Sequence, residues 1–169
     1  MSSARMSPRR LAKLDLLTHG VPAAYRTAVV MPTLFDSVEQ VQDILSNLEV
    51  QYLANRQPHL HFAVLSDFTD AATEHTPADA DILRAAVDGV SALNVRYAAD
   101  ADDAFHLIHR PRRWNAAEGV WMGWERKRGK LEEFNRFVLS GARDGFTVMV
   151  GDSAVLRHVR YVVTLDADT

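Results

Sequence analysis

Two aspartates follow the last apolar run of the sequence, spaced so that both can reach one cation. Residues 161–165 read Tyr-Val-Val-Thr-Leu, and Asp166 and Asp168 come next with one alanine between them. The run predicts a buried strand that delivers both carboxylates to its carboxyl end. Mg²⁺ or Mn²⁺ often binds through one or two carboxylates together with substrate phosphates. The spacing therefore predicts a divalent-cation site for a phosphate-bearing ligand; two solvated aspartates are the simpler alternative.

The position of this pair has its own implication. Both aspartates lie among the last four residues, so we expect further chain to be needed for the other half of a substrate pocket. A phosphatase of the haloacid dehalogenase type would carry Asp-x-Asp-x-Thr at a strand end. Here Thr169 follows Asp168 directly, one place too early, so that class of enzyme is disfavoured.

The elements that must position these acids alternate between strand and helix. Short apolar runs predict strands, and apolar residues three or four apart predict amphipathic helices. A capping box at Ser37 and Gln40 and the sequence Thr-Pro-Ala-Asp at residues 76–79 mark two helix starts. The expected strands are 27–31, 59–65, 104–109, 146–150 and 161–165, and the expected helices are 37–48, 76–93 and 127–139. Such alternation predicts a three-layer α/β/α fold with a mostly parallel sheet.

Composition places the chain among ordinary globular proteins. It has 169 residues, of which 47% are hydrophobic, a formal charge of −3 and no cysteine. The absence of cysteine excludes a disulfide scaffold, a zinc-thiolate site and a cysteine nucleophile. Residues 1–24 are expected to form a basic tail and lead-in, and residues 25–169 a single folded unit. No apolar stretch has the length of a signal peptide core or a membrane-spanning helix.

Parallel α/β sheets bind ligands outside the carboxyl ends of their strands, which draws attention to polar residues that follow the apolar runs. Thr33 comes after the first run and Asp67 after the second. Asp67 has a simpler alternative, because aspartate commonly caps a turn. His59 and His61 point to one face of a strand; packed histidines are favoured over a metal pair because no third ligand is in view.

Residues 110–130 carry a local charge bias. Seven basic residues face two acidic ones, giving +5, and all three tryptophans lie in the same segment. Arginine and tryptophan together are typical of surfaces that track phosphates and stack bases, so an anion-binding or nucleic-acid-binding module is the main alternative function. The net acidity of the chain and the lack of a recognisable nucleic-acid motif count against nucleic acid. The tryptophans fit two interpretations equally well: stacking on sugar and anchoring a long loop.

Several of these pieces resemble glycosyltransferases of the GT-A type. Residues 29–33 are similar to the opening strand of that family, and residues 165–168 resemble its DXD motif. Residues 129–135 are similar to the Gly-Lys-x-x-x-Leu-Asn pattern of processive members such as cellulose synthase. More closely, the chain resembles the glycosyltransferase domain of cyclic β-1,2-glucan synthases, through residues 59–67, 121–130 and 160–169.

The resemblance implies the nucleotide-binding half of a GT-A, Rossmann-like fold that holds UDP-glucose with Mg²⁺ or Mn²⁺. Thr33 and Asp67 would contact uridine, Lys130 would lie near the diphosphate, and Asp166 would hold ribose or donor sugar. Asp166 and Asp168 would bind the metal. Where relatives often carry two acids and a glycine after the second strand, this chain has Ser-Asp-Phe at residues 66–68.

The resemblance also implies a setting. Full members are inner-membrane proteins, so this chain would lie at the cytoplasmic face, with the remainder of the glucan synthase as its partner. The acceptor half and general base of the family lie after the DXD motif, so the chain is expected not to transfer glucose alone. A non-functional remnant is the third alternative; in either case an unpaired sheet edge predicts self-association.

Overall fold

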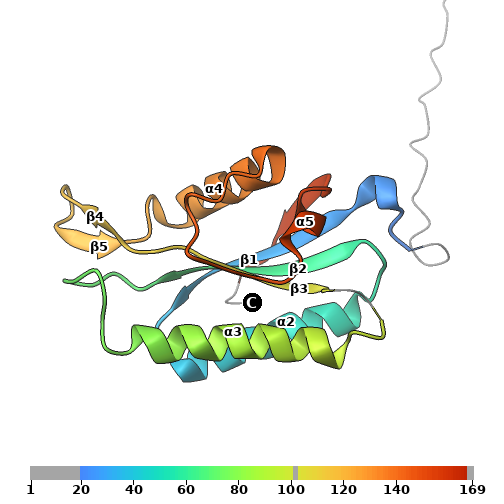
Figure 1. Cartoon of the computed structure of the whole chain (residues 1–169), viewed down its shortest axis with the longest axis horizontal. Coiled ribbons are helices and arrows are strands. Elements are labelled where there is room, and N and C mark those ends of the chain that lie inside the picture. The colour runs from blue at the N-terminus through green and yellow to red at the C-terminus, as the bar shows by residue number, and fades with distance from the viewer. Residues whose placement is uncertain (1–19, 101–102, 167–169) are drawn as a thin grey trace, which may run out of the picture.

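The computed structural model describes residues 20–100 and 103–166 and has three layers (Figure 1). A five-stranded sheet has the strand order β6-β3-β2-β1-β7, and every pairing is parallel except that of β6 with β3. Its strands are β1 Thr27–Phe35, β2 Leu60–Phe68, β3 Phe105–His109, β6 Val148–Val150 and β7 Tyr161–Thr164. The predicted α/β/α fold with a mostly parallel sheet is confirmed.

Helices cover both faces of the sheet. One face carries α2 (Val38–Ala54) and α3 (Asp79–Arg96), and the other carries α4 (Arg126–Ser140) and the short α5 (Ser153–Leu156). A single turn of 3-10 helix, η1 (Ala23–Tyr25), precedes β1. Within the described residues, no helix combines the length and apolar character needed to cross a membrane.

Side-chain alternation along the central strands produces two cores. Val29, Met31 and Phe35 of β1 pack toward α2 and α3, whereas Ala28 and Val30 pack toward α4 and α5. This is the period of two that a strand imposes on its side chains. Both faces of β2 and β3 are buried, as expected of the inner strands of a mostly parallel sheet that helices cover on both sides.

The predicted helix starts are close to the observed ones. The Ser37 hydroxyl accepts a hydrogen bond from the Gln40 amide at 3.1 Å, and the Gln40 side chain accepts one from the Asp36 amide at 2.9 Å. Helix α3 begins at Asp79, whose carboxylate accepts hydrogen bonds from the amide and hydroxyl of Thr76. The capping box is confirmed, reaching one residue further back than its usual form.

The sequence predicted a strand that ends before Pro32, but β1 continues to Phe35. The Thr27 amide donates to the His59 carbonyl oxygen, just before β2. The backbone N–H groups of odd-numbered β1 residues therefore point toward β2, and those of even-numbered residues point toward β7. The last β1–β7 pair is Val30 with Thr164, and the missing N–H of Pro32 lies beyond it. Proline therefore costs no ladder hydrogen bond here. β2 likewise extends to Phe68, so Thr33 and Asp67 lie inside strands.

The last strand is not buried, contrary to the prediction. Tyr161, Val162 and Val163 of β7 are all exposed. β7 pairs with β1 on one side and ends the sheet within the described part of the chain, so its faces lack the cover that β2 and β3 have. Self-association through this edge stays a prediction.

A small hairpin was not anticipated from the sequence. β4 (Arg113–Asn115) and β5 (Val120–Met122) form a separate two-stranded antiparallel sheet between β3 and α4. The Asn115 side chain accepts hydrogen bonds from the amides of Ala117 and Glu118, and Gly119 takes the left-handed conformation that closes the turn. The hairpin therefore gives the tryptophan-rich segment a defined structure.

Candidate functional site

A cavity of about 440 Å³ lies at the carboxyl end of β1. It brings together three of the four residues predicted to bind a nucleotide sugar: Thr33 from β1, Lys130 from α4 and Asp166 from the segment after β7. Arg126 and Lys127, at the start of α4, also line it. The cavity therefore has a basic wall facing a strand end, where α/β sheets bind ligands.

Lys130 connects this cavity to the interior. Its side chain is only 4% exposed, and its ammonium group lies 2.6 Å from the Thr33 carbonyl oxygen and 3.0 Å from the Asp67 carboxylate. Burial lowers the pKa of Lys130, and the charge of Asp67 opposes that effect. Helix α4 is thereby held against the ends of both β1 and β2.

Asp67 lies beneath the cavity. Its side chain is 1% exposed, and Arg110 binds its two oxygens through paired hydrogen bonds of 2.7 and 2.8 Å. A second carboxylate, Glu133, accepts from Arg110 at 3.0 Å. Burial alone would lower the pKa of Arg110, but the hydrogen bonds and charges of Asp67 and Glu133 raise it. Two acids and two bases therefore form a buried four-charge cluster: Asp67, Arg110, Lys130 and Glu133.

The same Arg110 fixes the turn that leads into α4. Its guanidinium donates to the carbonyl oxygens of Trp124 at 3.0 Å and Arg126 at 3.1 Å. Glu125 and Arg126 both have positive φ, at 51° and 46°, a conformation that costs a residue other than glycine about 1–3 kcal/mol. Buried hydrogen bonds therefore hold a strained turn at the edge of the cavity.

Two glycines allow the close approaches around this turn. A Cβ atom at Gly123 would lie 2.4 Å from an Asp67 oxygen, and one at Gly129 would lie 2.1 Å from the Trp124 carbonyl oxygen. Sequence reasoning treated Gly129 only as part of a family pattern and did not find Arg110 or Glu133. The available signal was an arginine directly after a predicted strand, followed by two glycines, Gly123 and Gly129, on either side of Trp124.

The predicted metal ligands are only partly within the described chain. The Asp166 carboxylate is 65% exposed and pairs with the Lys127 ammonium. Asp168 lies outside the described residues. Over residues 20–100 and 103–166, no group of three or more histidine, aspartate or glutamate side chains is placed to hold a metal. One exposed carboxylate beside a basic cavity suits Mg²⁺ or Mn²⁺ if substrate phosphates supply further oxygens.

His59 and His61 do not meet at a common site with a third ligand in the described structure. The His59 ring contacts the Arg26 guanidinium at 3.3 Å, whereas the His61 ring packs 5.7 Å from that of His106. Burial lowers the pKa of His61 to about 4. The arrangement matches packed histidines, the interpretation that the sequence favoured.

The basic segment is not an uncompensated positive surface. Each of its seven basic residues lies within 4 Å of at least one acidic side chain. The pairs are Arg110 with Asp67 and Glu133, Arg112 with Asp79, Arg113 with Glu133, Arg126 with Asp70 and Glu118, Lys127 with Asp166, Arg128 with Glu125 and Glu132, and Lys130 with Asp67. This neutralisation weakens the alternative of a nucleic-acid-binding surface.

No protein-family model matches the sequence. The chain is 47% identical over 162 residues to a segment of cyclic beta-(1,2)-glucan synthase NdvB from Rhizobium meliloti (strain 1021). The match spans 96% of this chain and 6% of the length of that protein. It supports the resemblance to a fragment of such a synthase that the sequence motifs indicated.

Proposed function

We propose that this chain is the UDP-glucose-binding part of a membrane-associated glucosyltransferase that makes cyclic β-1,2-glucan. The observation that carries the proposal is the cavity where Thr33, Lys130 and Asp166 meet. The 47% identity to part of a glucan synthase supports the same assignment. The parent enzyme would work at the cytoplasmic face of the bacterial inner membrane, as the family resemblance implies.

The basic wall of the cavity suits a diphosphate. Lys127 and Lys130 present cationic groups near the end of β1, and a diphosphate would compete with Asp166 for Lys127. Departure of UDP from the donor sugar builds negative charge on the diphosphate, which fixed cations stabilise. These residues would therefore bind the donor and favour loss of its leaving group.

Asp166 and Asp168 would hold Mg²⁺ or Mn²⁺. A divalent ion bound there would supply further charge stabilisation for the diphosphate. The carboxylates themselves orient the donor by accepting hydrogen bonds from its hydroxyl groups.

In our proposal, Asp67 supports this site indirectly, through the residues that it contacts. Both of its oxygens are engaged by Arg110, and one also by Lys130. It would keep the Lys130 ammonium at the cavity and the turn at residues 124–126 in place. Contact between Asp67 and uridine, which the resemblance implies, would require the carboxylate to give up one of these partners.

Calorimetric titration with UDP and with UDP-glucose, with and without Mn²⁺, tests the proposal. We expect binding that strengthens with Mn²⁺, loses its metal dependence in Asp168→Ala, and weakens in Lys127→Ala under both conditions. Asp81→Ala is the matched control, because Asp81 is an exposed acid on α3, on the opposite face of the sheet. Absence of binding by the wild-type chain at millimolar nucleotide in every condition would overturn the proposal.

A further inference from the structure

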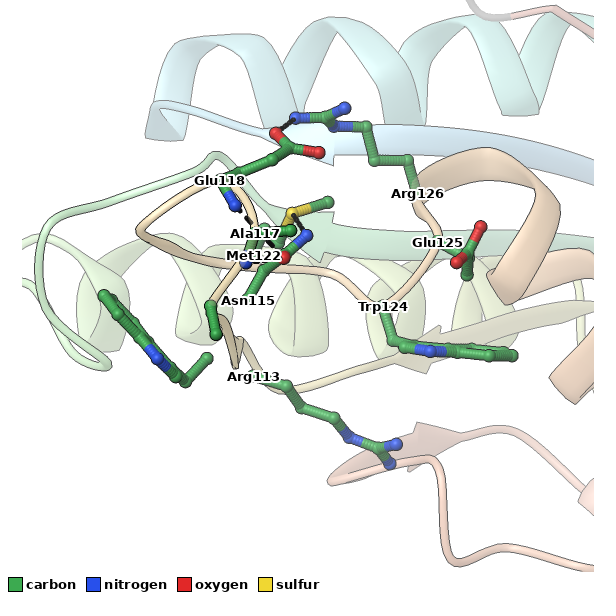
Figure 2. Close-up of a pocket in the computed structure, with 10 residues that line it drawn as sticks. Arg113, Asn115, Ala117, Glu118, Met122, Trp124, Glu125 and Arg126 are labelled. Atoms are coloured by element: carbon green, nitrogen blue, oxygen red, sulfur yellow. Dashed lines mark hydrogen bonds and ion pairs between the residues drawn. The ribbon is translucent and has the colours of Figure 1, made fainter.

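A second cavity, of about 490 Å³, lies between the β4–β5 hairpin and the start of α4 (Figure 2). Its walls include Trp114, Asn115 and Glu118 from the hairpin and Trp124 and Arg126 from the approach to α4. Figure 2 shows the Glu118 carboxylate of the hairpin meeting the Arg126 guanidinium, with Trp124 on the side of α4. The cavity is open and carries both aromatic and polar groups.

Two indole rings on this cavity are exposed to an unusual degree. Trp114 is 53% exposed and Trp124 is 43% exposed, although tryptophan is on average a highly buried residue. Trp114 rests on Trp121, with ring centroids 5.9 Å apart, so one side of it is already packed. Broad apolar ring faces beside polar groups suit a ligand that has an apolar face and a hydroxylated edge.

The charges on this cavity favour a neutral ligand. Its lining carries Arg113 and Arg126 against Glu118 and Glu125, so the formal charges cancel. Arg126 pairs with Glu118 at 2.6 Å and also with Asp70 at 3.0 Å. A phosphate or nucleic acid would have to break such pairs, whereas hydroxyl groups can donate to the acids and accept from the guanidinium without charge imbalance.

Hydrogen bonds tie both walls of the cavity to the rest of the fold. Ala71, just beyond β2, exchanges two backbone hydrogen bonds of 2.9 Å with Trp121 of the hairpin. Buried Arg110 holds the Trp124 carbonyl oxygen. Preorganised aromatic walls reduce the ordering cost of binding.

The two cavities share one residue. Arg126 lines both the cavity at the end of β1 and the cavity beside the hairpin. A ligand on the tryptophans would therefore lie next to a nucleotide sugar in the first cavity.

We propose that the hairpin cavity binds a neutral saccharide, namely a stretch of glucan chain away from its reacting end. The identity of the saccharide as glucan rests on the proposed function, whereas saccharide binding rests only on the geometry of this cavity. Trp114 and Trp124 stack on the C–H faces of glucose rings, and Asn115, Glu118 and Arg126 bind hydroxyl groups.

Titration of the whole chain with linear β-1,2-linked gluco-oligosaccharides, followed by tryptophan fluorescence and by the NMR signals of the indole N–H groups, tests this site. We expect saturable shifts of the Trp114 and Trp124 signals without nucleotide. Loss of one stacking ring should weaken binding by about threefold to tenfold in Trp114→Ala and Trp124→Ala. Tyr161→Ala is the matched control, because Tyr161 is an exposed aromatic residue on β7.

The two proposals can fail separately. UDP affinity, measured on the same variants, should be unchanged in Trp114→Ala, so saccharide binding without UDP binding would overturn only the donor assignment. If an alanine variant does not fold, chemical-shift mapping of residues 113–126 on the wild-type chain replaces it. The saccharide site is refuted if 10 mM oligosaccharide (about the weakest useful range) shifts no signal there with or without UDP and Mn²⁺. It is also refuted if single-stranded RNA shifts those signals at lower concentration than the saccharide does.

Discussion

The contact between Gly129 and the Trp124 carbonyl gives a sharp test of how the turn before α4 is held. In Gly129→Ala the new Cβ would lie 2.1 Å from that oxygen and 2.8 Å from the Glu125 Cβ. The oxygen belongs to the backbone and accepts a hydrogen bond from buried Arg110, so it has little freedom to retreat. We therefore expect the substitution to displace the turn and destabilise the protein.

The size of the effect follows from three contributions. Forcing an atom into filled space costs about 1–3 kcal/mol. Loss of the hydrogen bond from the charged Arg110 to the Trp124 carbonyl costs about 1.5–3 kcal/mol. Alanine inside a helix regains about 1 kcal/mol relative to glycine. The free energy of unfolding should therefore fall by about 1.5–5 kcal/mol.

Urea denaturation at equilibrium measures this change, with an unchanged m-value showing that the midpoint reports stability. Gly89→Ala in α3 is the matched control, because its new Cβ would lie 2.2 Å from Cδ1 of Leu45, the tip of a side chain that can rotate away. We expect that control to cost less than about 1 kcal/mol, since helix propensity offsets a small rearrangement. The reasoning is refuted if Gly129→Ala matches the wild type, or if Gly89→Ala loses as much stability.

Two further predictions concern buried charge. Arg110→Met leaves two buried carboxylates without their shared partner, so we expect a loss of about 3–5 kcal/mol by urea denaturation; a loss below that of an exposed-pair variant such as Arg84→Met would contradict it. Burial lowers the pKa of His61 and His109 to about 4 and that of His106 to about 3. In the unfolded chain the pKa of each would be about 6.5. The unfolded chain therefore binds more protons below pH 6.5, so stability should be full above that pH and fall steadily toward pH 4. Thermal melts across this range check the slope, His106→Leu should reduce it, and a flat profile between pH 7 and 5 would contradict the assignment.

The elements of the central sheet were predictable because their sequences carry one clear period each. The apolar runs of β2 and β3 and the stripes of α2 and α3 point to a single structure at every position. Strand ends were less predictable, because whether Pro32 stops a strand depends on which neighbour its missing N–H would face. The exposure of β7 likewise depends on its place in the sheet order, which its apolar sequence does not encode.

The buried four-charge cluster could not be predicted from the sequence, for a different reason. Arg110 meets carboxylates 43 and 23 positions away in the sequence, at Asp67 and Glu133. Local patterns identify charged residues as exposed, which is the usual outcome, so only the assembled fold reveals these pairs. The hairpin was not predicted because each of its strands has three residues, too few to show the alternation of apolar and polar residues typical of a strand.

The four-charge cluster also constrains how related sequences can differ. Its two acids and two bases sum to zero, and all four side chains are at most 7% exposed. Replacing any one of Asp67, Arg110, Lys130 or Glu133 alone would leave an uncompensated charge in the interior, whereas exchanging a whole pair for apolar residues would not. We therefore expect these positions to vary together across homologues or to stay fixed together.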